Sequence, residues 1–293
     1  MLYIVFMRKQ VVDRLDSVTF DELVARADPF FGDECSFDLT AVKWVSPAGL
    51  VQLATTCYSL QKMGRHPFIF LGDESVASYL SRAGFVAAIR PVATIEPNSF
   101  ATVPLDRLRG SNPMLIEVTK IERGRDLPAL LNNIVMVLRE KLKYKKRDAF
   151  DVATVISEVG QNTFDHNKET CGFIAMQVYE PRHGGSFLEI GIGDYGDGIA
   201  ETLRRNPNNP VIKTDLEAIQ IATKPGVSEH DDPTRGTGLY HLLEIAYKHE
   251  GMVQIRSGNG KVRYRMDKRM GFPFSVAYVP GVQIALQLTR KKR

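Results

Sequence analysis

Apolar residues recur at helical spacing along a long stretch in the second half of the chain, between Asp148 and Asn167. The stripe consists of Val152, Val155, Ile156 and Val159. This spacing predicts an amphipathic helix with one face buried against a sheet. The polar residues Glu158, Asn162 and His166 stand four positions apart, so they follow the edge of that face turn by turn. Such side chains can reach a ligand in a cleft, whereas solvated residues beside a core would give the same pattern.

The first third of the chain shows short apolar runs that alternate with helical patterns, from Met1 to about Pro104. The expected strands are LYIVFM, SFDLTAV before Trp44, and PFIFL, and the expected helices are Phe20–Ala27, Ala48–Met63 and Glu74–Ala83. Ser46 and Pro47 mark the start of the second helix, and Gly64 marks its end. This alternation predicts a small α/β sandwich.

A segment with several prolines and no sustained periodicity, Pro91 to Pro113, separates this part from the rest. The length of 293 residues is typical of two domains. We therefore expect an α+β protein with a first domain at 1–104, a linker at 105–112 and a second domain at 113–293. The expected elements of the second domain include the strands MLIEVTKI, GFIAMQVYE, SFLEIGIGD, MVQIRS, KVRYRM and VQIALQL, and the helix Leu127–Leu138 before the central one.

Charge and cysteine content narrow the class of protein. The net charge of +4 is small for this length, and the basic runs Arg139–Arg147 and Arg290–Arg293 are typical of solvated surface, so nucleic acid is a disfavoured partner. The cysteines Cys35, Cys57 and Cys171 are scattered, which argues against a disulfide framework and structural zinc. The opening apolar run is too short for a signal or membrane helix. We expect a cytoplasmic location and no membrane partner.

Candidate chemistry appears where the strand SFLEIGIGD ends, in the sequence DYGDG. Asp194, at the end of a buried strand, can accept a hydrogen bond from the exocyclic amine of adenine. Gly196 and Gly198 let the backbone approach a base without a Cβ in the way. A tight turn with a surface carboxylate would give the same short pattern.

The stretch from Ile199 to Arg235 is broken by four prolines and has no periodicity, so we interpret it as a lid or binding loop. The motif that closes it consists of Arg235, Gly236, Thr237, Gly238 and Leu239, directly before a helical stripe. Glycines at a helix start expose unpaired N–H groups at the positive end of the helix dipole, where phosphate binds. Lys224 and Arg235 can add positive charge, although each alone is also typical of a surface residue.

Taken in this order, the motifs resemble the GHKL ATPase family, which includes gyrase, MutL, histidine kinases and anti-sigma serine kinases. The resemblance covers about Asn112 to Leu288. It implies a Bergerat fold, a mixed and largely antiparallel sheet backed by helices, with ATP held under the lid.

The resemblance also implies roles for individual residues. Asn162 is the expected Mg²⁺ ligand, and Glu158, one turn earlier, the expected general base. The expected contacts to ATP are Asp194 with adenine, Gly196 and Gly198 around the base, Gly236, Thr237, Gly238 and Leu239 around the phosphates, and Lys224 and Arg235 as added charge. His166 is expected on the ribose and phosphate side, with a packing role as the alternative.

In the first part, the run FDLTAVKWVSPAGLVQLATTCYSLQKMGRHPFIFLGDESVASYLSRAGF resembles the STAS domain of anti-sigma factor antagonists. Those antagonists carry a phosphorylatable serine in the turn before the helix, usually after Asp. Here Ser46 replaces the Asp and Pro47 the serine, and proline has no hydroxyl. The resemblance therefore implies a binding module. Ser46 is expected to cap the helix, with phosphorylation of Ser46 as a weaker alternative.

Together these resemblances imply an ATP-binding regulatory protein that hydrolyses ATP or phosphorylates a partner protein on Ser or Thr with Mg-ATP. The alternative is a non-catalytic interaction module, gated by ATP and acting through its STAS-like domain. A sensor histidine kinase is disfavoured, because His66 alone precedes the ATP-binding part and follows a helix stop. The identity of the partner, turnover of ATP and a homodimeric state stay open at this point.

Overall fold

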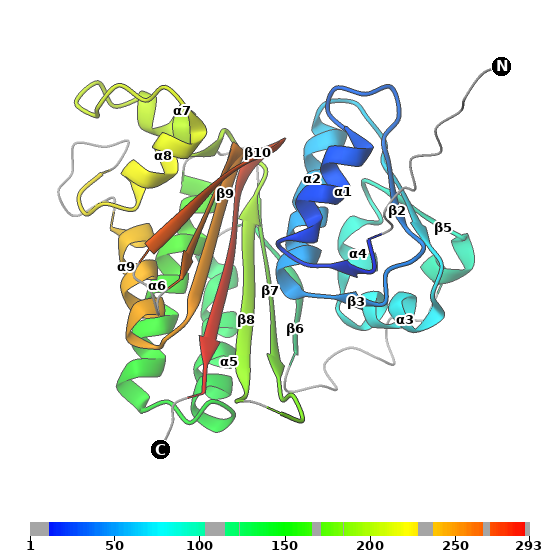
Figure 1. Ribbon diagram of the computed structural model, residues 1–293. Helices are drawn as coiled ribbons and strands as arrows, with labels where there is room; N and C mark the ends of the chain where they lie inside the picture. The colour runs from blue at the N-terminus through cyan, green and yellow to red at the C-terminus, as the bar shows by residue number, and fades with distance from the viewer. Residues whose placement is uncertain are drawn as a thin grey trace.

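The computed structural model describes residues 12–102, 115–122, 124–165, 171–183, 185–227, 237–265 and 270–290. Within these residues the protein is a mixed α+β structure whose strands form several sheets (Figure 1). No helix of the described part is long and apolar enough to cross a lipid bilayer. The expected opening strand LYIVFM and the expected linker 105–112 lie outside the described residues.

The largest sheet has five strands in the order β6-β7-β8-β10-β9, and every neighbouring pair is antiparallel. Its strands are β6 (Leu115–Ile121), β7 (Gly172–Tyr179), β8 (Phe187–Asp194), β9 (Met252–Arg265) and β10 (Met270–Thr289). The expectation of separate strands MVQIRS and KVRYRM is wrong, because both belong to β9. β10 pairs along the whole of β9 and absorbs the glycines around Gly258 through a shift of register, so the glycines do not end the strand.

One face of this sheet is covered by helices (Figure 1). They are α5 (Leu127–Glu140), α6 (Lys146–Asp165) and α9 (Gly238–Lys248), and a 3₁₀ turn at Gly124–Asp126 precedes α5. The predicted central helix is confirmed as α6, and Val152, Ile156 and Val159 of its stripe are buried in the core beneath the sheet. The stripe of α6 therefore fixes which way its polar edge points.

The segment expected to be an irregular lid contains two short helices, α7 (Gly198–Arg204) and α8 (Asp215–Ala222). The expectation of an irregular chain from 199 to 235 is therefore wrong for these parts, while residues 228–236 lie outside the described residues. α8 is held by the burial of Ala218 and Ile219 in the same core as α6. Helices of two turns are too short to produce a readable periodicity, which is why the pattern missed them.

The other face of the large sheet is covered by the first part of the chain (Figure 1). Its helices are α1 (Thr19–Ala27), α2 (Pro47–Lys62), α3 (Glu74–Arg82) and α4 (Phe85–Ile89). β2 (Ser36–Leu39), β4 (Phe68–Leu71) and β5 (Thr94–Glu96) form a parallel sheet, followed by a 3₁₀ turn at Asn98–Thr102. The expected strand before Trp44 ends earlier, and Trp44–Val45 is itself a strand, β3, which pairs with β1 (Arg14–Leu15).

Helix α2 lies directly on the large sheet, against β7, β8 and β10. Strand β8 makes this possible because its side chains alternate between the two faces of the sheet. Leu188, Ile190 and Ile192 enter the core beneath α6. The intervening position Gly191 faces α2, and a Cβ built there would lie 2.7 Å from the Pro47 carbonyl oxygen and from Ala48 Cα. Glycine is therefore required for the helix to approach the strand this closely.

The start of α2 is fixed by hydrogen bonds from both parts of the chain. Ser46 Oγ accepts from the Gly49 N–H at 3.2 Å, which confirms the expected helix cap, and Ser46 is fully buried. From β8, Glu189 Oε1 accepts from the Ala48 N–H at 3.2 Å. Burial raises the pKa of Glu189. Hydrogen bonds from Ser46, Gln287 and Ala48 favour the charged form, but they only reduce this rise. Because Ser46 is enclosed by these contacts, the structure gives no support to its phosphorylation.

A buried ion cluster joins α1 to β9. Asp21 Oδ1 lies 3.1 Å from Arg256 Nε, and Asp21 Oδ2 contacts Lys261 Nζ. The Arg256 side chain is completely buried and that of Lys261 is 5% exposed. Two cations next to each other in a core depend on the carboxylate between them, so Asp21 ties the first part of the chain to the large sheet.

We expect Asp21→Asn to lower the free energy of unfolding by about 3–5 kcal/mol, because it leaves two buried cations without a counter-charge. Glu22→Gln is the matched control on the next position of α1: Glu22 pairs with Arg26 on the surface, so its loss should stay within about 0.5 kcal/mol. Urea unfolding at pH 7 measures both. Equal effects of the two substitutions would contradict the role assigned to Asp21.

Candidate functional site

Two of the sequence motifs lie on the neighbouring helices α6 and α9, on one face of the large sheet, and a third lies where strand β8 ends (Figure 1). β8 ends at Asp194, whose register partner is Gly172, the first residue of β7. α6 ends at Asp165 and packs on β7 and β8. α9 packs beside α6 and starts with Gly238. The fold therefore brings the motifs of α6 and α9 into contact, and the Asp194 motif lies at the end of β8.

The first turn of α9 touches the polar edge of α6. A Cβ built on Gly238 would lie 3.4 Å from Asn162 Nδ2, 3.6 Å from Glu158 Cβ and 3.8 Å from Glu158 Oε2. These are ordinary contact distances, and the glycine does not adopt a positive φ. The backbone therefore has no need of glycine at 238, and its absent side chain leaves a small space bordered by a carboxylate and an amide. We call this arrangement the Gly238 contact.

Asp194 lies at the end of β8 with its carboxyl group turned into the turn that follows. Its Oδ1 accepts from the Gly196 N–H at 2.8 Å. Burial raises the pKa of Asp194 to about 7, although N–H groups of Gly196 and Val282 oppose the shift, and the nearby Asp197 adds to it. A carboxyl group poised to gain or lose its proton near neutrality is typical of a functional site.

Gly198, the first residue of α7, has a backbone reason to be glycine. Its φ is +81°, and a Cβ there would lie 2.9 Å from Ser257 Oγ. The two predicted glycines thus differ in their structural role. The backbone conformation at Gly198 requires glycine, whereas that at Gly238 does not.

The remaining predicted residues fall into two groups. Lys224 is exposed just after α8, Thr237 occupies the N-cap position of α9 without a side-chain cap bond, and Leu239 packs partly buried against the core. His166, Arg235 and Gly236 lie outside the described residues. Asp194, at the end of β8, is not one of the groups that border the Gly238 contact.

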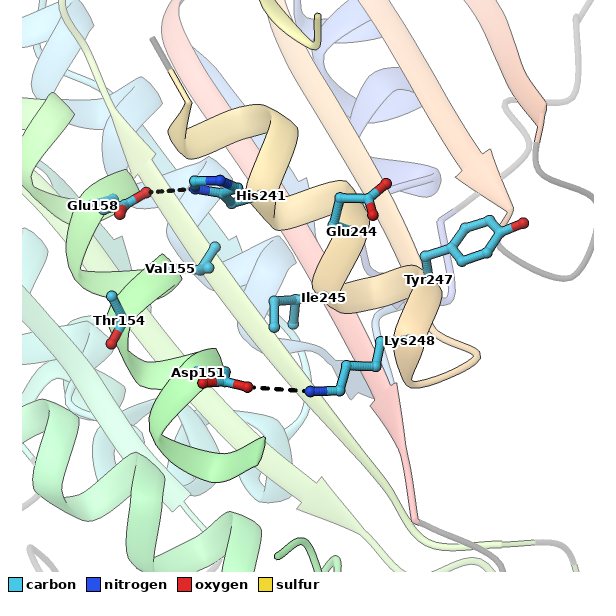
Figure 2. Close-up of a pocket in the computed structure, with 9 residues that line it drawn as sticks. All are labelled: Asp151, Thr154, Val155, Glu158, His241, Glu244, Ile245, Tyr247 and Lys248. Carbon is cyan, nitrogen blue, oxygen red and sulfur yellow. Dashed lines mark hydrogen bonds and ion pairs between the residues drawn. The ribbon is translucent and has the colours of Figure 1, made fainter. Parts of the chain in front are cut away.

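Beside the Gly238 contact, a groove of about 550 Å³ runs between α6 and α9 (Figure 2). At one end of this α6–α9 groove, Glu158 Oε2 lies 3.4 Å from His241 Nδ1. At the other end, Lys248 Nζ lies 2.8 Å from Asp148 and 3.1 Å from Asp151. Both helices thus hold each other through charged or polar pairs at the two ends of the groove.

Sequence reasoning missed His241. The signal was present, because His241 follows Gly238 by three positions and so lies on the same side of the helix one turn later. Which residue of α6 it would meet could not be read from the spacing, since the pairing of two helices is decided by their packing.

Chemically, the α6–α9 contact offers a half-buried carboxylate, an imidazole beside it, a side-chain amide and the backbone N–H groups of a helix start. Glu158 can accept a proton from water or a hydroxyl, and Asn162 can offer an oxygen to a hard cation. Among the described residues, no group of three or more His, Cys, Asp or Glu side chains is arranged to hold a metal ion.

Comparisons of the chain with protein-family models, with curated proteins and with solved structures found no match.

The raised pKa of Asp194 predicts a pH-dependent stability. The native carboxyl binds its proton more tightly than the unfolded chain, in which the pKa is about 3.9, so its ionisation destabilises the fold as the pH rises from about 4 to about 7. We expect the free energy of unfolding of Asp194→Asn to exceed that of the wild type by about 4 kcal/mol at pH 8, and not to exceed it at pH 4. Urea unfolding across this range measures it. Glu201→Gln, on the surface of α7, serves as the control. A gain in the free energy of unfolding of Asp194→Asn that is independent of pH would contradict the raised pKa of Asp194.

Proposed function

We propose that this chain is an ATP-binding regulatory protein of the GHKL family, which hydrolyses ATP or transfers its γ-phosphate to a serine or threonine of a partner protein. In this proposal, residues 113–293 form a Bergerat-fold domain and residues 1–104 a STAS-like domain joined to it by the linker 105–112. The observation that carries it is the Gly238 contact, where the start of α9 leaves space against Glu158 and Asn162.

The nucleotide would lie across the end of the large sheet. Asp194 would accept a hydrogen bond from the adenine amine, with Gly196 holding that carboxyl in place by its N–H. The N–H groups at the start of α9 would bind phosphate oxygens in the space that Gly238 leaves open. Mg²⁺, when bound, would neutralise phosphate charge, and Asn162 is the residue placed to hold it.

Glu158 is the residue proposed as the general base. Its Oε2 borders the Gly238 contact and lies 3.4 Å from His241 Nδ1. The interaction with His241 reduces the rotamers open to the carboxylate, and a base held in position takes a proton more efficiently than a free one. Solvent can enter from the α6–α9 groove, so water is one acceptor for the phosphate, and a hydroxyl of a partner is the other.

A second candidate function, an ATP-gated interaction module without turnover, is favoured by a separate observation. Tyr195, next to Asp194, packs against Tyr58 of α2, with ring centroids 5.5 Å apart. The turn proposed to bind adenine therefore touches the first part of the chain. A ligand that orders this turn would change how α2 is held, and with it the surface offered to a partner.

We expect Glu158→Gln to bind ATP like the wild type and to release phosphate about 10²–10⁴-fold more slowly, because only the proton acceptor is lost. Asn162→Ala should lose the part of ATP binding that depends on Mg²⁺.

Gly238→Ala should stabilise the helix by about 0.5–1 kcal/mol and weaken ATP binding, since its methyl group fits the fold but occupies the proposed phosphate space. Binding of a fluorescent ATP analogue, phosphate release and urea unfolding measure these effects.

Glu140→Gln, an exposed carboxylate on α5, is the control for these variants and should leave both binding and turnover unchanged. A wild-type chain that binds no ATP with Mg²⁺ present would refute both candidate functions. A chain that binds ATP but releases and transfers no phosphate would leave the interaction module standing.

For the interaction module, we expect a non-hydrolysable ATP analogue to slow amide hydrogen exchange in α2. Tyr195→Ala should keep ATP binding and lose this protection, because the ring that links the turn to α2 is gone. Tyr278→Ala, an aromatic residue that packs against Phe30 and Phe31 instead, is the control and should keep it. Unchanged exchange in wild-type α2 with the analogue bound would exclude gating through this contact.

A further inference from the structure

Glu158 is shared by two neighbouring features of the site. Its Oε2 borders the Gly238 contact, and the same side chain lines the α6–α9 groove (Figure 2). Among the described residues, the lining of the groove includes neither Asn162 nor Gly238. The groove therefore approaches the proposed base from a side that the proposed nucleotide residues do not occupy.

The charges in the groove disfavour a triphosphate. Asp151, Glu158 and Glu244 are among the residues that line it, and Figure 2 shows Asp151 and Glu158 on α6 and Glu244 on α9. Lys248, the ammonium group within the described lining, is already held by Asp148 at 2.8 Å and Asp151 at 3.1 Å. Like charges oppose binding and complementary charges favour it, so this lining selects a cationic occupant over ATP.

The floor of the groove is apolar. Val155 of α6 and Ile245 of α9 are both buried and lie between the charged ends (Figure 2). The groove is open along the two helices and has a volume of about 550 Å³, which accommodates a few residues of an extended chain. An apolar floor with acidic groups around it fits a polypeptide segment whose basic side chains reach the edges.

We propose that the α6–α9 groove is the acceptor side of the site, and that it binds a basic polypeptide segment whose serine or threonine hydroxyl reaches Glu158. This inference rests on the proposed function and selects protein phosphorylation within it. In the transfer, the hydroxyl oxygen bonds to the γ-phosphorus of ATP as the bond from that phosphorus to the β–γ bridging oxygen breaks. ADP leaves with the electron pair, and the hydroxyl proton passes to Glu158, which His241 positions.

The test uses the full chain with Mg²⁺ and radiolabelled ATP, and two short peptides that each carry one serine. In one peptide arginines flank the serine, and in the other glutamates do. We expect the arginine peptide to be phosphorylated with a kcat/KM at least about ten-fold higher than the glutamate peptide. Glu244→Lys should raise the KM for the arginine peptide by about five- to ten-fold and leave the KM for ATP unchanged, with Glu244→Gln in between.

Glu140→Lys is the matched control, because it reverses an exposed carboxylate on α5 outside the groove and should leave both KM values unchanged. Glu244 is exposed, so its substitution does not threaten the fold, and the thermal midpoint checks this. If the wild type turns over ATP but phosphorylates neither peptide, prefers the glutamate peptide, or responds equally to Glu140→Lys, the inference is overturned while the proposed function stands. If it binds no fluorescent ATP analogue, the proposed function itself has failed.

Discussion

Burial of strand β8 on both faces is the constraint on which the rest of the structure depends. Ile190 and Ile192 enter the core beneath α6, and Gly191 on the opposite face admits the start of α2 to contact with the strand backbone. A strand covered on both sides has no polar face to give to water. The two parts of the chain are therefore packed through continuous surfaces: the core of the first part also includes Phe173 of β7.

Polar groups set the orientation within this apolar contact. Glu189 of β8 accepts from the first turn of α2, and Asp21 of α1 lies between Arg256 and Lys261 of β9. Apolar packing alone allows a helix to shift slightly on a sheet. A shift that separates a buried charge from its partner costs much more free energy, so it is disfavoured. These groups fix where α1 and α2 lie on the sheet, and so determine which residues touch the turn after Asp194.

The candidate site depends on the same sheet from its other face. α6 is held by its apolar stripe, which turns Glu158 and Asn162 toward the start of α9. α9 then packs beside α6 so that Gly238 meets both side chains and His241 meets Glu158 one turn later. One strand thus supports the proposed nucleotide site on one side and the first part of the chain on the other, which is why the two candidate functions share a structural basis.

The sequence alone determined the local features that follow from periodicity and backbone chemistry: the helix α6 and its stripe, strands β7 and β8, the cap at Ser46 and the polar residues at the border of the core. It misjudged β9, where pairing with β10 carried the strand through its glycines, and α8, which a core contact holds despite its length. It also missed His241 and the α6–α9 groove. Spacing within one helix reports which face its residues share, but contacts between α6 and α9 exist only once both pack on the sheet. The tertiary structure alone decided that Glu158 has His241 beside it and that Gly238 leaves space, because both depend on distances between segments that the sequence does not encode locally.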